Sequence, residues 1–146
     1  MTKFFATEAA VERIGAGLLD RSLPKAEWTH AAHFAAALWL LRRHPQAEVS
    51  ARMPDLIRAY NAAVGGVNSD TEGYHETITQ ASIGEAARFL AGRPAAEPLH
   101  EVVDRLMASP LGDRDWLLAY WSKERLFSVA ARRGWVAPDL AALPEG

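Results

Sequence analysis

Two short segments of the chain contain the residue types that could do chemistry. One is Trp28-Thr29-His30-Ala31-Ala32-His33, and the other is Tyr74-His75-Glu76-Thr77. Imidazoles spaced three residues apart lie on one face of an α-helix, so His30 and His33 can reach a common point. A His-Glu pair supplied by a second helix would complete that point. We therefore expect a polar site, either a metal site or an acid–base site, where the two segments meet.

The metal hypothesis takes His30, His33 and His75 as ligands. The chain has no cysteine, so a metal would have to be held by His, Asp or Glu. This donor set suits a divalent ion such as Zn²⁺, Fe²⁺ or Mn²⁺. Glu76 would then be a further ligand or the catalytic general base. A bound water would ionise near neutral pH for hydrolysis, and a redox ion would bind O₂, so both hydrolase and oxidoreductase remain open.

Two hypotheses need no metal. In the first, the His-Glu cluster is a hydrogen-bonded network that fixes the register of the helices. Glu76 then has an ordinary role in the first turn of its helix, where the helix dipole favours a carboxylate. Such a protein would be a non-catalytic interaction module, and its apolar helices would form the interface of a homodimer. In the second, the protein binds a small molecule in a pocket near Asn61 and Asn68.

The two segments also carry a resemblance. The aromatic-x-His-x-x-His and Tyr-His-Glu-Thr motifs are similar to those of an uncharacterised family of small bacterial helical proteins. The C-terminal region fits the same pattern through Ala131-Arg132, Trp135, Pro138-Asp139-Leu140 and Leu143-Pro144. The resemblance covers most of the chain. It implies a site at the motif residues His30, His33, His75 and Glu76, and it implies no particular reaction.

Composition excludes several classes of protein. A chain of 146 residues, 49% of them hydrophobic, has the size and content of one compact domain. Its formal net charge of −2 argues against a nucleic-acid binder that depends on a large positive field. The start of the chain does not resemble a signal peptide, and the longest apolar run, Phe34 to Leu41, is too short to span a bilayer. We expect a cytoplasmic protein that binds neither nucleic acid nor membrane.

The elements that position the two motifs read as helices throughout. Apolar residues recur at helical spacing, and no segment alternates as a strand would. The stretch from Thr29 to Leu41 is apolar on nearly all sides, which is typical of a helix buried among others. The sequence therefore predicts one all-α domain over residues 1–146, a bundle of six or seven helices between an N-terminal tail (1–6) and an extended C-terminal tail (136–146). The expected helices span about 8–19, 25–43, 47–64, 74–91, 97–107, 116–121 and 123–133.

Overall fold

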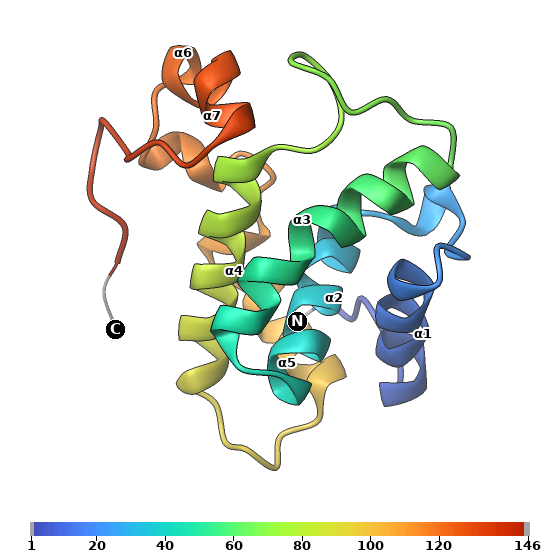
Figure 1. The fold of residues 1–146 in the computed structure, drawn as a ribbon. Helices are drawn as coiled ribbons and strands as arrows, with labels where there is room; N and C mark the ends of the chain where they lie inside the picture. Colours follow the sequence, from blue (N-terminus) through green and yellow to red (C-terminus); the bar gives the residue numbers. More distant parts are fainter. Residues whose placement is uncertain (1, 145–146) are drawn as a thin grey trace.

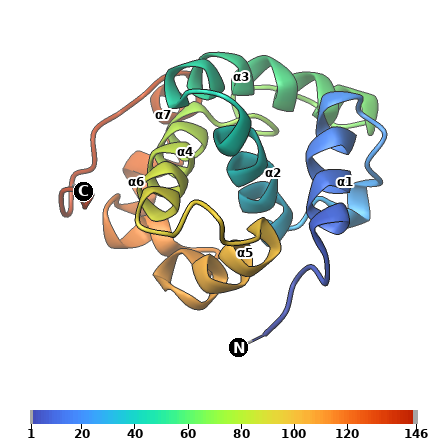
Figure 2. The ribbon, with the colours of Figure 1, turned by 90° about the horizontal axis from the view of Figure 1, so that it is seen from below.

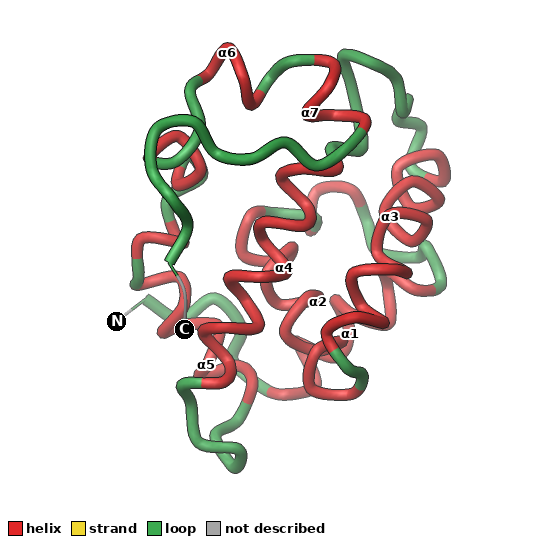
Figure 3. Tube along the Cα trace, turned by 60° about the vertical axis from the view of Figure 1, so that its left-hand side comes forward, coloured by secondary structure: helices red, strands yellow, loops and turns green. Residues whose placement is uncertain are grey.

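The computed structural model describes residues 2–144, and their regular structure is entirely helical (Figures 1 and 3). The α-helices are α1 (Glu8–Leu19), α2 (His30–Arg43), α3 (Gln46–Ala63), α4 (Glu76–Ala91), α5 (Leu99–Ala108), α6 (Lys123–Leu126) and α7 (Val129–Arg133). Three single 3₁₀ turns span Lys25–Glu27, Pro110–Gly112 and Trp116–Ala119. The prediction of a single-domain helical bundle is confirmed.

Helix α2 lies at the centre of the bundle. It contacts α1, α3, α4 and α5, which surround it in the view along the bundle (Figure 2). Its side chains from Phe34 to Leu40 are all buried. Five alanines in this helix keep its surface narrow, and they let the neighbouring backbones approach closely. The buried central helix expected from the sequence is thus confirmed.

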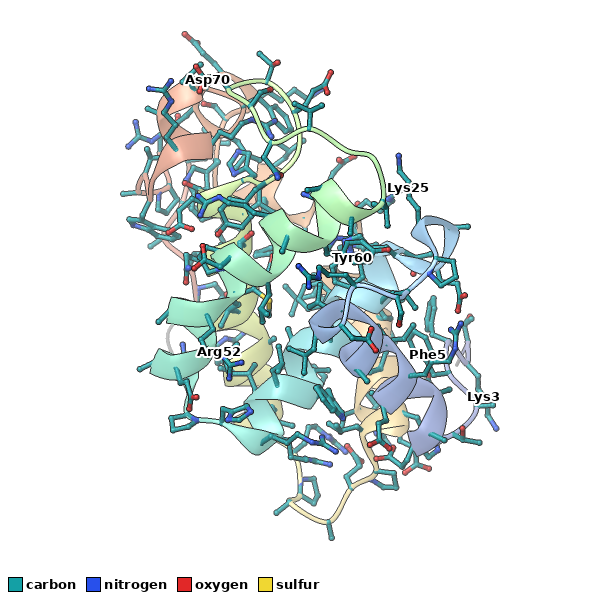
Figure 4. The ribbon with its side chains drawn as sticks, turned by 45° about the vertical axis from the view of Figure 1, so that its right-hand side comes forward. Lys3, Phe5, Lys25, Arg52, Tyr60 and Asp70 are labelled. Carbon is teal, nitrogen blue, oxygen red and sulfur yellow. The ribbon has the colours of Figure 1, made fainter. Side chains whose placement is uncertain are left out.

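Two glycines set the distance between α1 and its neighbours. A Cβ atom placed on Gly15 would lie 2.3 Å from a ring carbon of Trp39 on α2, and one on Gly17 would lie 2.9 Å from the Cβ of Leu23. On the other side, the hydroxyl of Tyr60 in α3 donates a hydrogen bond of 2.8 Å to the carbonyl of Leu23 (Figure 4). The connection between α1 and α2 is therefore packed against α1 at Gly17 and hydrogen-bonded to α3 through Tyr60.

The C-terminal third departs from the helices that the sequence predicts. A single helix over 123–133 is wrong, because the chain bends after Leu126 and restarts as α7. The hydroxyl of Ser128 accepts a hydrogen bond from the backbone of Ala131, so a side-chain cap competes with continuation of the helix. The stretch 116–121 holds only a 3₁₀ turn. The helices after Asp113 are therefore short, and α7 packs against α4.

The ends and the longest loop are tied to the body. Residues 2–6 and 134–144 have no helix, while residue 1 and residues 145–146 of the predicted tails lie outside the described residues. The indole of Trp121 donates to the carbonyl of Val136 at 3.0 Å. The loop between α3 and α4 runs beside α7, where Arg133 forms a two-fold hydrogen-bonded pair with Asp70 at 2.7 Å (Figures 1 and 4). No helix within residues 2–144 is long and apolar enough to cross a bilayer.

Candidate ligand pocket

A pocket of about 420 Å³ lies between α2, α3, α4 and the segment 114–127. Eighteen residues line it, and twelve of these are apolar, including aromatic side chains from three different elements. The polar lining residues are His30, His33, Thr79, Ser82, Arg114 and Asp115. The first histidine motif therefore lies in the wall of this cavity.

His33 is held in one orientation by the start of α2. Thr29 caps this helix, its hydroxyl accepting from the backbone of Ala32 at 3.2 Å. The Nδ1 atom of His33 lies 2.7 Å from the Thr29 carbonyl, which can only accept, so Nδ1 carries the proton. The ring also stacks on Trp28, with centroids 3.9 Å apart. His33 therefore presents an unprotonated Nε2 that bonds to no described residue.

The surroundings keep His33 neutral. Its side chain is accessible through the pocket, yet protein atoms surround the ring closely enough for desolvation to dominate. This burial lowers the pKa of His33 from 6.5 to about 4. The Thr29 carbonyl opposes the shift, while electrostatic interactions with His30 and Arg114 add to it. At neutral pH the Nε2 atom of this pocket-lining imidazole is therefore a hydrogen-bond acceptor.

His30, the first residue of α2, is also oriented by a hydrogen bond to a backbone carbonyl. Its Nε2 lies 2.9 Å from the carbonyl of Leu111, so Nε2 is the protonated nitrogen. The ring meets Phe34 edge-on, with centroids 5.3 Å apart and planes at 84°. Nδ1 has no hydrogen-bond partner within residues 2–144. Both histidines of the first motif thus donate one N–H to the backbone and keep one free nitrogen.

His75 is placed differently, because it is the N-cap of α4. Its Nδ1 accepts a hydrogen bond from the backbone of Ile78 at 3.1 Å, and its Nε2–H donates to the carbonyl of Leu126 at 2.6 Å. Helix α4 therefore begins one residue after His75, two residues later than the sequence suggests. Burial lowers the pKa of His75, consistent with a neutral ring whose two nitrogens are both occupied. This side chain ties the start of α4 to the end of α6.

Glu76 pairs with the residue at the start of its own motif. The hydroxyl of Tyr74 donates a hydrogen bond to the Oε1 atom of Glu76. Burial raises the pKa of Tyr74, and this hydrogen bond to Glu76 raises it further. The guanidinium of Arg58 lies over the Tyr74 ring, 4.4 Å from its centroid. Glu76 thus belongs to a small cluster at the α3–α4 connection and does not line the pocket.

The structure brings two of the three predicted ligands together. His30 and His33 share the pocket, whereas both nitrogens of His75 are committed to backbone groups. In residues 2–144, no group of three or more His, Asp or Glu side chains is arranged to hold a metal ion. The metal site of His30, His33 and His75 and the catalytic role of Glu76 remain predictions from the sequence.

Several pocket residues were not found by sequence reasoning. Ser82 and Arg114 carry no motif, and only the spacing of Ser82 from Thr79 on one face of α4 gives a signal. Conversely, Asn61 and Asn68 are not at the pocket. The Asn61 amide donates to the Oδ1 atom of Asn68 at 3.1 Å, and Asn68 donates to the carbonyl of Arg58 at 3.0 Å. These two residues organise the loop after α3.

Comparisons with family models, curated proteins and solved structures gave no match for this chain. The resemblance to a bacterial helical family therefore rests on the quoted motifs alone. Any function must be argued from the pocket and its residues.

Proposed function

We propose that this protein binds a small, largely apolar molecule in the pocket between α2, α3, α4 and the segment 114–127. The observation that carries the proposal is the pocket itself. Its volume of about 420 Å³ falls in the range of roughly 300–1,000 Å³ that is common for small-molecule sites. A mostly apolar wall with a few convergent polar groups is the usual composition of such sites.

The rigidity of the polar groups also supports the proposal. The imidazoles of His30 and His33 are fixed by hydrogen bonds to backbone carbonyls and by contacts with aromatic rings. Groups that are oriented before the ligand arrives cost little conformational entropy on binding. At the buried His75, by contrast, backbone groups bond to both nitrogens.

The test uses ethylbenzene as an apolar probe and amide NMR shifts of the wild-type protein as the readout. Ser82→Phe places a large side chain in the pocket, and Ala51→Phe adds the same side chain at an exposed position of α3. We expect saturable shifts at residues around the pocket in the wild type and in Ala51→Phe, and their loss in Ser82→Phe. The absence of saturable binding, or equal binding by the two variants, would overturn the proposal.

The metal hypothesis is an arm of the same experiment. Zn²⁺, Fe²⁺ and Mn²⁺ are added to untagged protein, and bound metal is counted by elemental analysis. Stoichiometric metal that disappears in His30→Ala would make the pocket a metal centre, and it would displace the proposal of a purely organic ligand.

A further inference from the structure

We propose that the ligand is a neutral apolar molecule with a hydroxyl group, and that this hydroxyl donates a hydrogen bond to Nε2 of His33. The inference rests on the proposed function, because it names the chemical class of the molecule that the pocket takes. It follows from which nitrogens of the pocket histidines are already bonded, and from the charges that surround them.

The tautomer of His33 is fixed by its backbone contact. Nδ1 must be protonated to bond the Thr29 carbonyl at 2.7 Å, so Nε2 of the neutral ring has a lone pair and no hydrogen. The side chain is exposed where it lines the pocket, and Nε2 has no partner in the described part of the chain. A ligand that covered this atom without a donor would leave it desolvated and unpaired, and its binding would be weakened.

In the neutral form of His30, Nε2–H donates to the Leu111 carbonyl, so its free nitrogen, Nδ1, is also an acceptor. A pocket whose two imidazoles both offer lone pairs selects for hydrogen-bond donors. A carboxylate brings only lone pairs of its own, so it would meet two acceptors and no donor from these rings.

The remaining charged groups do not change this conclusion. Arg114 and Asp115 are the two charged side chains in the lining, and both are exposed. Their opposite charges offset one another, so the lining favours neither an anion nor a cation. A neutral hydroxyl compound fits all of these groups.

The hydroxyls of Thr79 and Ser82 stand on the α4 wall of the pocket. Each can donate or accept, so they are compatible with a ligand hydroxyl that gives its hydrogen to His33 and uses its lone pairs elsewhere. The deciding group is therefore His33, whose role as acceptor is fixed.

The experiment compares four probes that share an apolar body. They are ethylbenzene, 4-ethylphenol, its methyl ether 4-ethylanisole, and 4-ethylbenzoate. One hydrogen bond contributes about 0.5–1.5 kcal/mol net, so we expect the phenol to bind roughly twofold to twelvefold more tightly than the ether, with the benzoate weakest. His33→Phe keeps a ring for stacking on Trp28 but removes the acceptor. It should bind phenol and ether equally, while His44→Phe, outside the pocket, should behave as the wild type.

The outcomes separate the two proposals. If ethylbenzene binds but the phenol shows no advantage over the ether, the inference about the hydroxyl is overturned and the proposed function stands. If no probe binds, the proposed function is overturned and the inference fails with it. A phenol preference that persists in His33→Phe, or tighter binding of the benzoate, also overturns the inference.

A second measurement avoids dependence on the variant's folding. In wild-type protein labelled with ¹⁵N at histidine, the resonance of the unprotonated Nε2 of His33 should shift with 4-ethylphenol and remain unchanged with 4-ethylanisole. Equal shifts with both probes, or a spectrum in which Nε2 carries the proton, would contradict the inference.

Discussion

Replacing His75 should destabilise the fold through two separate hydrogen bonds. His75→Ala removes the cap that accepts from the Ile78 backbone, and loss of an N-cap costs about 0.5–2 kcal/mol. It also leaves the buried carbonyl of Leu126 without a donor, at about 1–3 kcal/mol. We expect the free energy of unfolding to fall by about 2–4 kcal/mol. Domains of this size typically have about 5–15 kcal/mol in total, so the variant should still fold.

The matched variant His75→Asn separates the two contributions. Asparagine is a good N-cap, so it replaces the acceptor for Ile78 but does not reach Leu126. Its loss should be smaller than that of His75→Ala by about 1 kcal/mol. Urea unfolding followed by circular dichroism measures both variants against the wild type, and equal m-values would show that the same structure unfolds in each.

Two results would refute this account of His75. The first is a loss below about 1 kcal/mol for His75→Ala, since that would mean neither bond matters to the fold. The second is a wild-type protein that EDTA destabilises as much as the alanine substitution does. In that case a metal held by His75 would be the source of stability, and His75 would not act as the N-cap of α4 in the native protein.

Two further predictions concern packing and acid. Gly15→Ala should lower the free energy of unfolding by about 1–3 kcal/mol, because its methyl group would overlap the Trp39 ring. Gly84→Ala should raise it by about 0.5–1 kcal/mol, because no atom lies within 4 Å of the added carbon and alanine favours a helix. Urea unfolding measures both variants. The free energy of unfolding should also fall as pH drops below about 6.5. Folding lowers the pKa of His33 and His75, so in this range the unfolded chain binds more protons. Urea midpoints measured between pH 7 and pH 4 should decline less steeply in His75→Asn, and an unchanged slope would exclude a contribution from His75.

The fold could be predicted because its main signals are local. Helical periodicity and the apolar surface of the stretch Thr29 to Leu41 indicate a buried helix, and α2 is buried. Its expected start near residue 25 is too early, because Lys25–Glu27 form a separate 3₁₀ turn and α2 begins at His30 after the Thr29 cap. The region after Asp113 could not be predicted as well. Its short helices have a composition similar to that of longer ones. Ser128, the N-cap of α7, follows α6 by two residues, and a serine within an apparently helical stretch does not by itself predict a break.

The site was predictable only in part, for a similar reason. Spacing alone places His30 and His33 on one face of a helix, and the structure puts both in the pocket wall. The opposite walls come from residues far along the chain, such as Ser82 and Arg114, and their approach depends on tertiary packing. The role of His75 was hidden because histidine is not among the usual N-cap residues, so its position before a helix does not suggest a cap.

The three motif histidines differ in role because the backbone bonds to both ring nitrogens of one histidine and to only one nitrogen of each of the other two. Each ring donates one N–H to a carbonyl, from Thr29, Leu111 or Leu126. At His75 the second nitrogen accepts from Ile78, so nothing is left for a ligand and the side chain holds two helices together. At His30 and His33 the second nitrogen has no partner in the described chain. The same residue type therefore builds the scaffold at one motif and leaves two oriented acceptors at the other, and a ligand with a hydroxyl group is the simplest chemistry that uses them.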